Sequence, residues 1–420
     1  MKGRKDSKGR NLRDGESQLQ DGRYRFRYQD RNGNRQAVYS WRLVATDKTP
    51  AGKRDSPPLR EKEEAIAADL RDGIDGKAAG KLTLNDYFSV YMDGKRDLKE
   101  TSVLTYEHVY NWYVRDAIGN MRLSQIRYSD VKRLYNALLD SGLKQNTVRI
   151  AHDILNPLFA LAVRDGLIRS NPAAGLMREI RNAHSGQSPP RHALTIQEQT
   201  AFVDFVAASP VFRHWLPLFT FLLGTGCRIG EALGLTWDDC DMKNGTISIN
   251  HTLSYRPANG GGYAFRVSTP KTAKGCRMIP MLKEVREALN EERRRQMRDG
   301  ISTFEVDGYR GFIFTSKLGK PRMTEEIHGA LKRIYTAYNA QETERARLEG
   351  RDPVLIRPFS AHNLRHTFCT RFCENETNVK VIQEIMGHSN VQTTLNIYAE
   401  VTESKKQDAF ANLEGKIKLC

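Results

Sequence analysis

Several features are missing from this sequence. Its 420 positions contain no run of 18 or more apolar residues, and the N-terminal stretch MKGRKDSKGRNLRDGES has no apolar signal core. These absences argue against a membrane span and against secretion. The six cysteines form no C-x-x-C pair and no disulfide framework, which is typical of a reducing compartment. We therefore expect a cytoplasmic protein with no membrane partner.

Acidic residues are in deficit, with 50 Asp and Glu against 66 Lys and Arg, a net charge of +16. The first 60 residues hold 16 of the basic and only 7 of the acidic residues. A polyanion is the expected partner, and nucleic acid is favoured over anionic lipid because no basic amphipathic helix has a large apolar face. The alternative is a protein that is merely basic.

Basic and aromatic residues alternate near the N-terminus, in GRYRFRYQDRNGNRQAVYSWRLV. A period of two indicates a strand whose successive side chains point to opposite faces, here one arginine face and one aromatic face. Asn32-Gly33 predicts a hairpin turn into a second strand. An arginine-faced sheet fits a DNA groove, whereas the alternative is a hairpin with solvated arginines. The candidate DNA contacts are Arg23, Arg25, Arg27, Tyr39 and Trp41.

The remainder divides into two parts. Residues 83–175 carry apolar side chains at helical spacing in four stretches, and REIRNAHSGQSPPRHALT, residues 178–195, has the polarity of a linker. The last part mixes helical patterns with β-like segments. We therefore predict a multidomain fold in three parts: a small β-sheet domain with a linker helix (1–75), an all-α domain (76–185), and an α+β, mainly α, domain with a C-terminal tail (186–420).

The stretch AHNLRHTFCTRFC, residues 361–373, resembles a metal site. On a helix its two histidines and two cysteines form one stripe. The stripe is roughly 16 Å long at 1.5 Å per residue, so four ligands cannot meet one tetrahedral metal ion. His362 and His366 alone lack the glutamate of H-E-x-x-H, and Arg365 beside them suits a phosphate better than a cation. A plain core helix, with Leu364 on its apolar face, is the other alternative.

Further candidates for phosphate chemistry lie elsewhere in the last 230 residues. Arg228 follows a Gly-rich turn at a predicted helix start, with Glu231 one turn on. Lys271 lies in a predicted hairpin, and His388 ends a predicted helix ten residues before Tyr398. Each signal is weak alone. Together they form an ordered series: Arg, Lys, His-x-x-Arg, His, Tyr.

That series resembles the tyrosine recombinases, the phage integrase family, through TGCRIGEALGL, HNLRHTF and MGHSNVQTTLNIY. YSWRLVATDK is similar to the arm-binding domain of conjugative-transposon integrases. Many relatives place the tyrosine nine residues after the second histidine, whereas here the spacing is ten. By this resemblance Glu231 is a supporting residue, and the catalytic set is Arg228, Lys271, His362, Arg365, His388 and Tyr398.

The resemblance implies an enzyme that cuts and rejoins DNA through a 3′-phosphotyrosine, to integrate and excise a mobile element of a bacterium. No metal, ATP or other cofactor is expected, because guanidinium groups suit the phosphate charge. The implied partners are double-stranded DNA at core and arm sites, three further copies in a homotetramer, and, as candidates, an excisionase and DNA-bending host proteins. The amphipathic tail QDAFANLEGKIKLC is predicted to pack on a neighbouring protomer.

Three alternatives stay open at this point. A type IB topoisomerase would use the same chemistry on one duplex. A DNA-binding regulator would need no nucleophile, although it would have no use for the lysine and the terminal tyrosine. A zinc-dependent nuclease would lose activity in EDTA.

Overall fold

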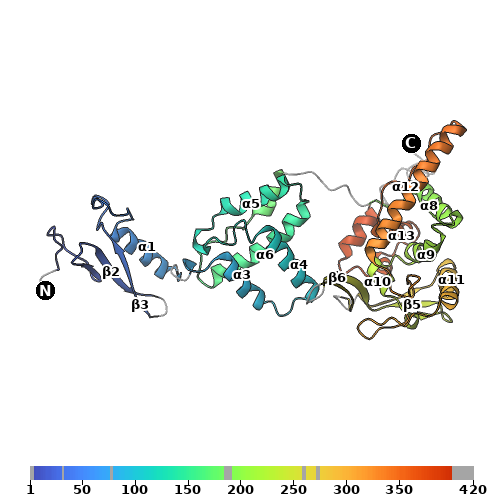
Figure 1. The fold of residues 1–420 in the computed structure, drawn as a ribbon, viewed down its shortest axis with the longest axis horizontal. Coiled ribbons are helices and arrows are strands. Elements are labelled where there is room, and N and C mark those ends of the chain that lie inside the picture. The colour runs from blue at the N-terminus through green and yellow to red at the C-terminus, as the bar shows by residue number, and fades with distance from the viewer. Residues whose placement is uncertain are drawn as a thin grey trace, which may run out of the picture. The chain divides into compact units, whose positions relative to one another are not determined.

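The computed structural model describes residues 4–30, 33–75, 79–183, 192–257, 262–270 and 275–399. By its internal contacts the chain divides into two units, Met1–Gly186 and Gln187–Cys420. The first contains a small sheet and a group of helices, and the second is α+β and mainly helical (Figure 1). The predicted fold class is confirmed.

The N-terminal part is an antiparallel sheet followed by one helix. Its strand order is β1-β2-β3. The predicted hairpin is present, because β2 pairs with β3 and Gly33 lies in the turn with φ of 78°. Trp41 lies one residue beyond β3, and β1 was not predicted. The elements are β1 (Glu16–Gln18), β2 (Tyr24–Gln29), β3 (Arg35–Ser40) and α1 (Leu59–Arg71).

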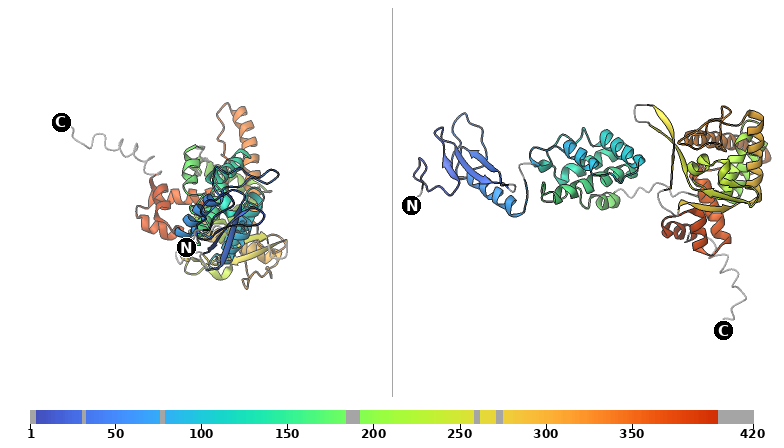
Figure 2. Two further views of the ribbon diagram at one scale, coloured as in Figure 1. Left: turned by 90° about the vertical axis from the view of Figure 1, so that its left-hand side faces the viewer. Right: turned by 90° about the horizontal axis from the view of Figure 1, so that it is seen from below.

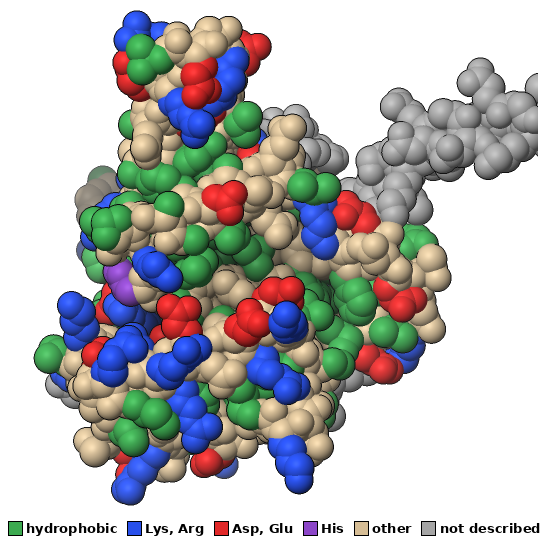
Figure 3. All heavy atoms as spheres, turned by 90° about the vertical axis from the view of Figure 1, so that its right-hand side faces the viewer, with side chains coloured by type: hydrophobic (Ala, Val, Ile, Leu, Met, Phe, Trp, Pro, Cys, Tyr) green, Lys and Arg blue, Asp and Glu red, His purple; other side chains and the backbone are tan. Residues whose placement is uncertain are grey.

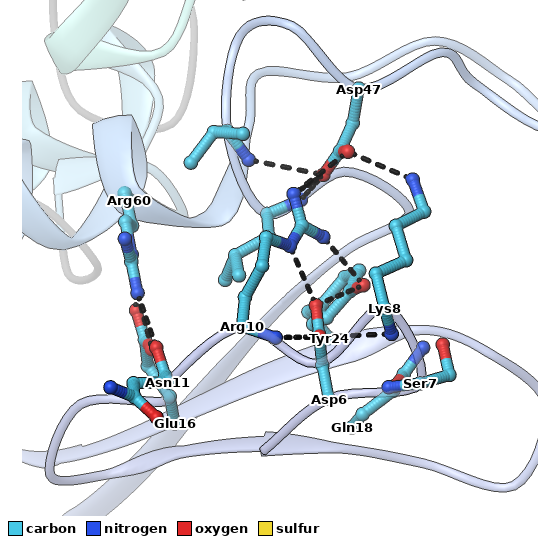
Figure 4. Close-up of polar contacts among 12 residues, drawn as sticks. Asp6, Ser7, Lys8, Arg10, Asn11, Glu16, Gln18, Tyr24, Asp47 and Arg60 are labelled. Carbon is cyan, nitrogen blue, oxygen red and sulfur yellow. Dashed lines mark hydrogen bonds and ion pairs between the residues drawn. The ribbon is translucent and has the colours of Figure 1, made fainter.

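A polar network supports this small sheet (Figure 4). The described apolar cluster around it has three buried members, Tyr24, Leu43 and Leu59, which is little for an independent core. Arg10 donates from Nε to Asp6 at 2.8 Å and from Nη1 to Asp47 at 2.9 Å, and the Tyr24 hydroxyl donates to Asp6 at 3.0 Å. These bonds satisfy buried polar groups beside the apolar cluster.

Among the described residues, the helical part contains the four expected helices and a further one near its end. Its core is built from the apolar faces of α3, α4, α5 and α6. The prediction of a linker from residue 178 was wrong at its start, because α7 runs to residue 183 and buries Leu176 and Ile180 one turn apart. The helices are α3 (Leu84–Asp93), α4 (Glu100–Tyr113), α5 (Tyr128–Asp140), α6 (Gln145–Arg164) and α7 (Leu176–Ala183).

The second unit surrounds one large apolar core, to which α9 contributes Phe219, Phe221 and Leu222, all fully buried. Helices α11 and α13 both pack on α9, so segments far apart in the sequence lie side by side (Figure 1). The helices are α8 (Ile196–Ala208), α9 (Leu216–Thr225), α10 (Ile229–Gly234), α11 (Lys283–Asp299), α12 (Thr324–Glu349), α13 (Ala361–Asn375) and α14 (Val379–Met386), and residues 391–399 are also helical.

Two antiparallel sheets complete this unit. One has the order β4-β5-β8, and the other is the β6–β7 hairpin, which stands at the edge of the unit (Figure 2). Strand β6 packs closely on α10, because a Cβ at Gly230 would lie 2.5 Å from the Thr252 hydroxyl. The strands are β4 (Cys240–Asp241), β5 (Thr246–Ile249), β6 (Thr252–Pro257), β7 (Tyr263–Ser268) and β8 (Arg277–Pro280).

Within the described ranges, no single helix is both long enough and apolar enough to cross a membrane. One pair bent by 118°, α8 with Arg213–Thr225, has a suitable length and composition, and both of its members contribute to the core of the second unit.

Candidate active site

Arg228 and Glu231 are positioned by the junction between α9 and α10. Gly226 ends α9 with a left-handed φ of 63°, and a Cβ there would lie 2.3 Å from a ring carbon of Phe368. Arg228 is the N-cap of α10: its backbone N–H donates to Glu231 Oε2 at 2.9 Å, and its Nη1 donates to Oε1 at 2.8 Å. The Arg228 side chain is still 44% exposed, so it is tethered but accessible.

Arg365 reaches the same place from the second turn of α13. It is buried, and its guanidinium donates to the carbonyl of Gly226 at 2.6 Å and to that of Met386 at 2.5 Å. Burial, together with the charge of Arg228, lowers the pKa of Arg365 to about 10. The residue remains charged at neutral pH, and its hydrogen bonds go to neutral carbonyls. No carboxylate among these partners neutralises its positive charge, which is therefore available to an anion.

The C-terminal end of α14 gathers three arginines. The carbonyls of residues 385, 386 and 387 accept hydrogen bonds from Arg277 Nε at 2.8 Å, Arg365 Nη2 at 2.5 Å and Arg228 Nη2 at 3.2 Å, respectively. Carbonyls in the last turn of a helix have no partner within the helix and carry its negative partial charge. Three guanidinium groups from β8, α13 and α10 thus meet at one helix end.

Glu231 is the carboxylate of this cluster. It accepts from Arg277 at 2.8 and 3.2 Å in addition to Arg228. Burial alone would raise the pKa of Glu231, but the hydrogen bonds and charge of Arg277, with the charge of Arg228, lower it to about 2. Glu231 is therefore ionised at neutral pH. One carboxylate against three guanidinium groups leaves the cluster positively charged, as a phosphate site requires.

His388 follows directly after the helix end. It is buried, and its Nδ1 lies 2.9 Å from the hydroxyl of Thr394, which has no exposed surface. Burial lowers the pKa of His388 to about 4, and the nearby charges of Arg365 and Arg228 act in the same direction. His388 is therefore a neutral imidazole at pH 7, and its ring is oriented by Thr394.

The other predicted residues are placed as follows. His362 is exposed on the first turn of α13, close enough to oppose protonation of His388. Tyr398 is partly buried in the helical segment 391–399 and packs on an apolar cluster that includes Met386, the residue whose carbonyl Arg365 contacts. Lys271 lies outside the described residues, as does the predicted C-terminal tail.

The two cysteines of the stretch 361–373 pack in the interior. Cys369 and Cys373 are buried in the same cluster as Met386, while His366 is half-buried, with Nδ1 3.4 Å from the Thr370 hydroxyl. Within the described ranges, no group of three His, Cys, Asp or Glu side chains has the geometry of a metal site.

The N-terminal arginine face also forms one cluster. Arg25 lies directly opposite Tyr39 across β2 and β3, and cross-strand partners share a face of a sheet. The Arg23 guanidinium lies over both aromatic rings, 5.5 Å from that of Tyr39 and 5.8 Å from that of Trp41. Arg27 is exposed two residues further along β2. The structure therefore assembles charged and aromatic side chains on one surface.

Figure 3 shows one face of the second unit, on which Lys and Arg side chains gather mainly in the lower part among scattered Asp and Glu. The basic excess is therefore mixed with acidic groups on this face.

Two residues of the site were missed by sequence analysis. Arg277 lies on β8 two positions before Ile279, which is buried. An arginine at an inward-facing position of a strand is the signal that could have identified it. Thr394 is buried at the His388 ring, and nothing in its local sequence marks it.

Three family models match the chain. The phage integrase family matches residues 193–405, the DNA binding domain of Tn916 integrase matches residues 1–70, and the N-terminal SAM-like domain of phage integrases matches residues 83–139. Because the first model covers half of the chain and contains the whole arginine cluster, the chain belongs to the phage integrase family, the tyrosine recombinases, which are enzymes that cut and rejoin DNA.

Relatives of this chain include proteins of transposons. The chain is 32% identical to the transposase from transposon Tn1545 of Streptococcus agalactiae and to that from Tn916 of Enterococcus faecalis, in each case over 95% of this chain and 94% of the relative. Among solved structures it is similar to the Tn1549 transposon integrase in complex with a circular intermediate DNA, with a TM-score of 0.68 and 27% identity over 78% of this chain and 100% of that one.

Proposed function

We propose that this tyrosine recombinase integrates and excises a conjugative transposon by cutting and rejoining DNA at specific sites. The observation that supports this most directly is the meeting of Arg228, Arg277 and Arg365 at the end of α14, around the single carboxylate of Glu231. Such a site attracts a phosphodiester and stabilises the further negative charge of its transition state. The likeness to the Tn1549 integrase bound to DNA agrees with this function.

The proposed reaction is a transesterification. The Tyr398 oxygen bonds to the scissile phosphorus, the bond to the 5′-oxygen breaks, and a 3′-phosphotyrosine results. Arg228 and Arg365 hold the non-bridging oxygens. His362 assists removal of the Tyr398 proton, and Lys271 protonates the leaving 5′-oxygen. Attack by the 5′-hydroxyl of another strand reverses these steps and frees the tyrosine.

His388 contributes a hydrogen bond from a neutral ring. If the Thr394 hydroxyl donates to Nδ1, the ring hydrogen is on Nε2, which then donates to a non-bridging oxygen of the phosphate. Because burial and three arginines keep the ring neutral, this donor is present across the neutral pH range.

The reaction as proposed needs neither metal nor ATP. The guanidinium groups supply positive charge, and the phosphotyrosine retains the energy of the broken bond. To test this, the full chain is incubated in EDTA without ATP, with a nicked duplex that carries a junction between the element and its flanking DNA. We expect a covalent adduct that peptide mapping assigns to Tyr398.

The matched control is Tyr398→Phe, which should bind the same duplex and form no adduct. Cleavage that EDTA abolishes would favour the zinc nuclease, and an adduct on another residue would refute the assigned nucleophile. If wild type and Tyr398→Phe bound the duplex equally and neither formed an adduct, the DNA-binding regulator would be favoured.

The last part of the proposal concerns assembly: four copies of this chain act together on two duplexes. The N-terminal arginine face would hold arm sites, the two other domains would hold the core site, and an excisionase and DNA-bending host proteins would direct the reaction. Strand exchange between two labelled duplexes separates this function from that of a type IB topoisomerase, which would relax one duplex without exchange. Deleting residues after 402 should disturb assembly if the tail packs on a neighbour.

A further inference from the structure

We propose that Arg277 is a positioning residue that takes up the charge of Glu231, so that the guanidinium of Arg228 stays available to the scissile phosphate. The inference rests on the proposed function and adds a residue to it. Arg277 lies outside the catalytic series that the sequence motifs define.

Arg277 does not face the DNA itself. Its side chain is only 5% exposed, and its three guanidinium nitrogens are all engaged: Nε with the Ile385 carbonyl, and Nη1 and Nη2 with Glu231. A guanidinium bonded in this way has no free edge for a phosphate oxygen. Arg277 therefore acts through its neighbours.

The neighbour that matters most is Glu231, which lies between two arginines. Its carboxylate contacts Arg228 at 2.8 Å and Arg277 at 2.8 Å. The two arginines differ in exposure, because the Arg228 side chain is 44% exposed and that of Arg277 is buried. Without Arg277, the buried carboxylate would rely on Arg228 for its compensating charge, and this closer pairing would cancel the charge that the phosphate needs.

Arg277 also holds the helix end to which the site is attached. A Cβ at Gly387 would lie 3.0 Å from Arg277 Nη1, and Gly387 has a left-handed φ of 62°. Arg277 Nε donates to the carbonyl of Ile385 at 2.8 Å. This bond holds the backbone of the next two residues, whose carbonyls accept from Arg365 and Arg228. His388 is the next residue along the chain.

A double-mutant cycle tests the charge relation. The rate of adduct formation is measured in a single turnover at saturating protein, on the nicked element-junction duplex, for wild type, Arg277→Gln, Glu231→Gln and the double variant. We expect Arg277→Gln to lower the rate on the order of 100-fold, because it leaves a buried carboxylate with a single partner. In the Glu231→Gln background the same change should cost less than about 10-fold, because no charge remains to be offset.

Arg277→Lys provides a second measurement if Arg277→Gln folds poorly. It keeps the charge and should remain within roughly 10-fold of wild type. The control pair is Arg295 and Glu292, bonded at 2.6 Å on α11 away from the cluster; Arg295→Gln should change thermal stability and leave the single-turnover rate unaltered.

Equal losses from Arg277→Gln in both backgrounds would overturn the inference, as would a folded Arg277→Lys variant as slow as Arg277→Gln. A wild-type chain that forms no adduct would instead refute the proposed function, and the inference with it. The two failures are therefore distinguishable.

Discussion

At the scale of single residues, the buried hydroxyl of Thr394 orients the ring of His388. It lies 2.9 Å from Nδ1 of His388 and has no exposed surface. A neutral imidazole carries its hydrogen on one nitrogen only, and the partner of the other nitrogen selects which. A buried side chain thus selects which ring nitrogen of His388 donates.

Thr394→Val should slow adduct formation by roughly 10- to 100-fold, because valine fills the same volume but has no hydroxyl to fix the ring. Single-turnover cleavage of the nicked junction duplex measures the effect, and DNA affinity should be unchanged. Thr394→Ser is the matched control, since it keeps the hydroxyl and should cleave at nearly the wild-type rate. Equal defects in Thr394→Val and Thr394→Ser would show that the methyl group matters and the hydroxyl does not.

At the scale of elements, the turn after α9 positions two arginines of the cluster, because it contains the carbonyl that Arg365 contacts and leads into Arg228. Gly226 supplies the carbonyl that Arg365 contacts at 2.6 Å, in a left-handed conformation with φ of 63°. Its missing side chain leaves room for Phe368 and for Met386, whose sulfur would lie 3.1 Å from a Cβ. The absence of a side chain at Gly226 therefore allows α9, α13 and α14 to pack closely against one another.

Gly226→Ala should destabilise the second unit by about 2–4 kcal/mol, because it adds backbone strain to a collision with Phe368. Urea unfolding of the full chain measures the change. Because the strained turn carries the Arg365 partner, adduct formation should fall as well, even at temperatures where the variant stays folded.

Gly329→Ala is the control for this substitution. Gly329 lies inside α12 with no positive φ, and a Cβ added there would have open space within 4 Å. Alanine there should stabilise the helix by up to about 1 kcal/mol. If both variants were equally stable, the steric account of Gly226 would be wrong.

At the scale of the whole molecule, the two units depend on charge in different ways. The second unit has a large apolar core, and its buried ionisable groups lie both in the arginine cluster and elsewhere, as at Glu198 and Glu292. The N-terminal sheet has a small apolar cluster and depends on ion pairs, including Arg60 with Glu16 at 3.0 Å (Figure 4). Its stability should therefore respond to pH.

Glu63 on α1 is the group whose titration should make the stability of this sheet depend on pH. Burial raises the pKa of Glu63 from 4.5 to about 7, and the neighbouring carboxylate of Glu16 acts in the same direction. Because the folded pKa is above the unfolded one, this contribution to stability is complete below pH 4.5 and is lost as pH rises through 7. The N-terminal sheet should thus weaken between pH 5 and pH 8.

Glu63→Gln should remove this loss, because the amide beside Glu16 carries no charge at any pH. We expect slower hydrogen exchange of the β1 and β2 amides in the full-length variant than in wild type at pH 8, and equal rates at pH 5. Glu64→Gln, which changes the exposed neighbour, should leave both rates unchanged. A variant that exchanges faster than wild type at pH 8 would contradict the protonation of Glu63.

Periodicity along the chain was sufficient to place most of the elements. Alternation in residues 24–29 and helical spacing in α3 to α6 depend on which face each side chain must bury, and this is a local property. The start of α7 escaped prediction because two buried residues in a polar segment are too weak a signal. Lys271 stays a prediction, since it lies outside the described residues.

The sequence by itself therefore determined most of the elements, the fold class and the ordered series of arginine, histidine and tyrosine side chains, because residue type and spacing can be read along the chain. Only the tertiary structure decided that Arg228, Arg277 and Arg365 all donate to carbonyls at the end of α14. It also decided that the Glu231 carboxylate accepts from both Arg228 and Arg277, and that His388 is neutral. These features depend on burial and on hydrogen bonds between residues up to 159 positions apart, which arise only when α9, β8, α13 and α14 pack together.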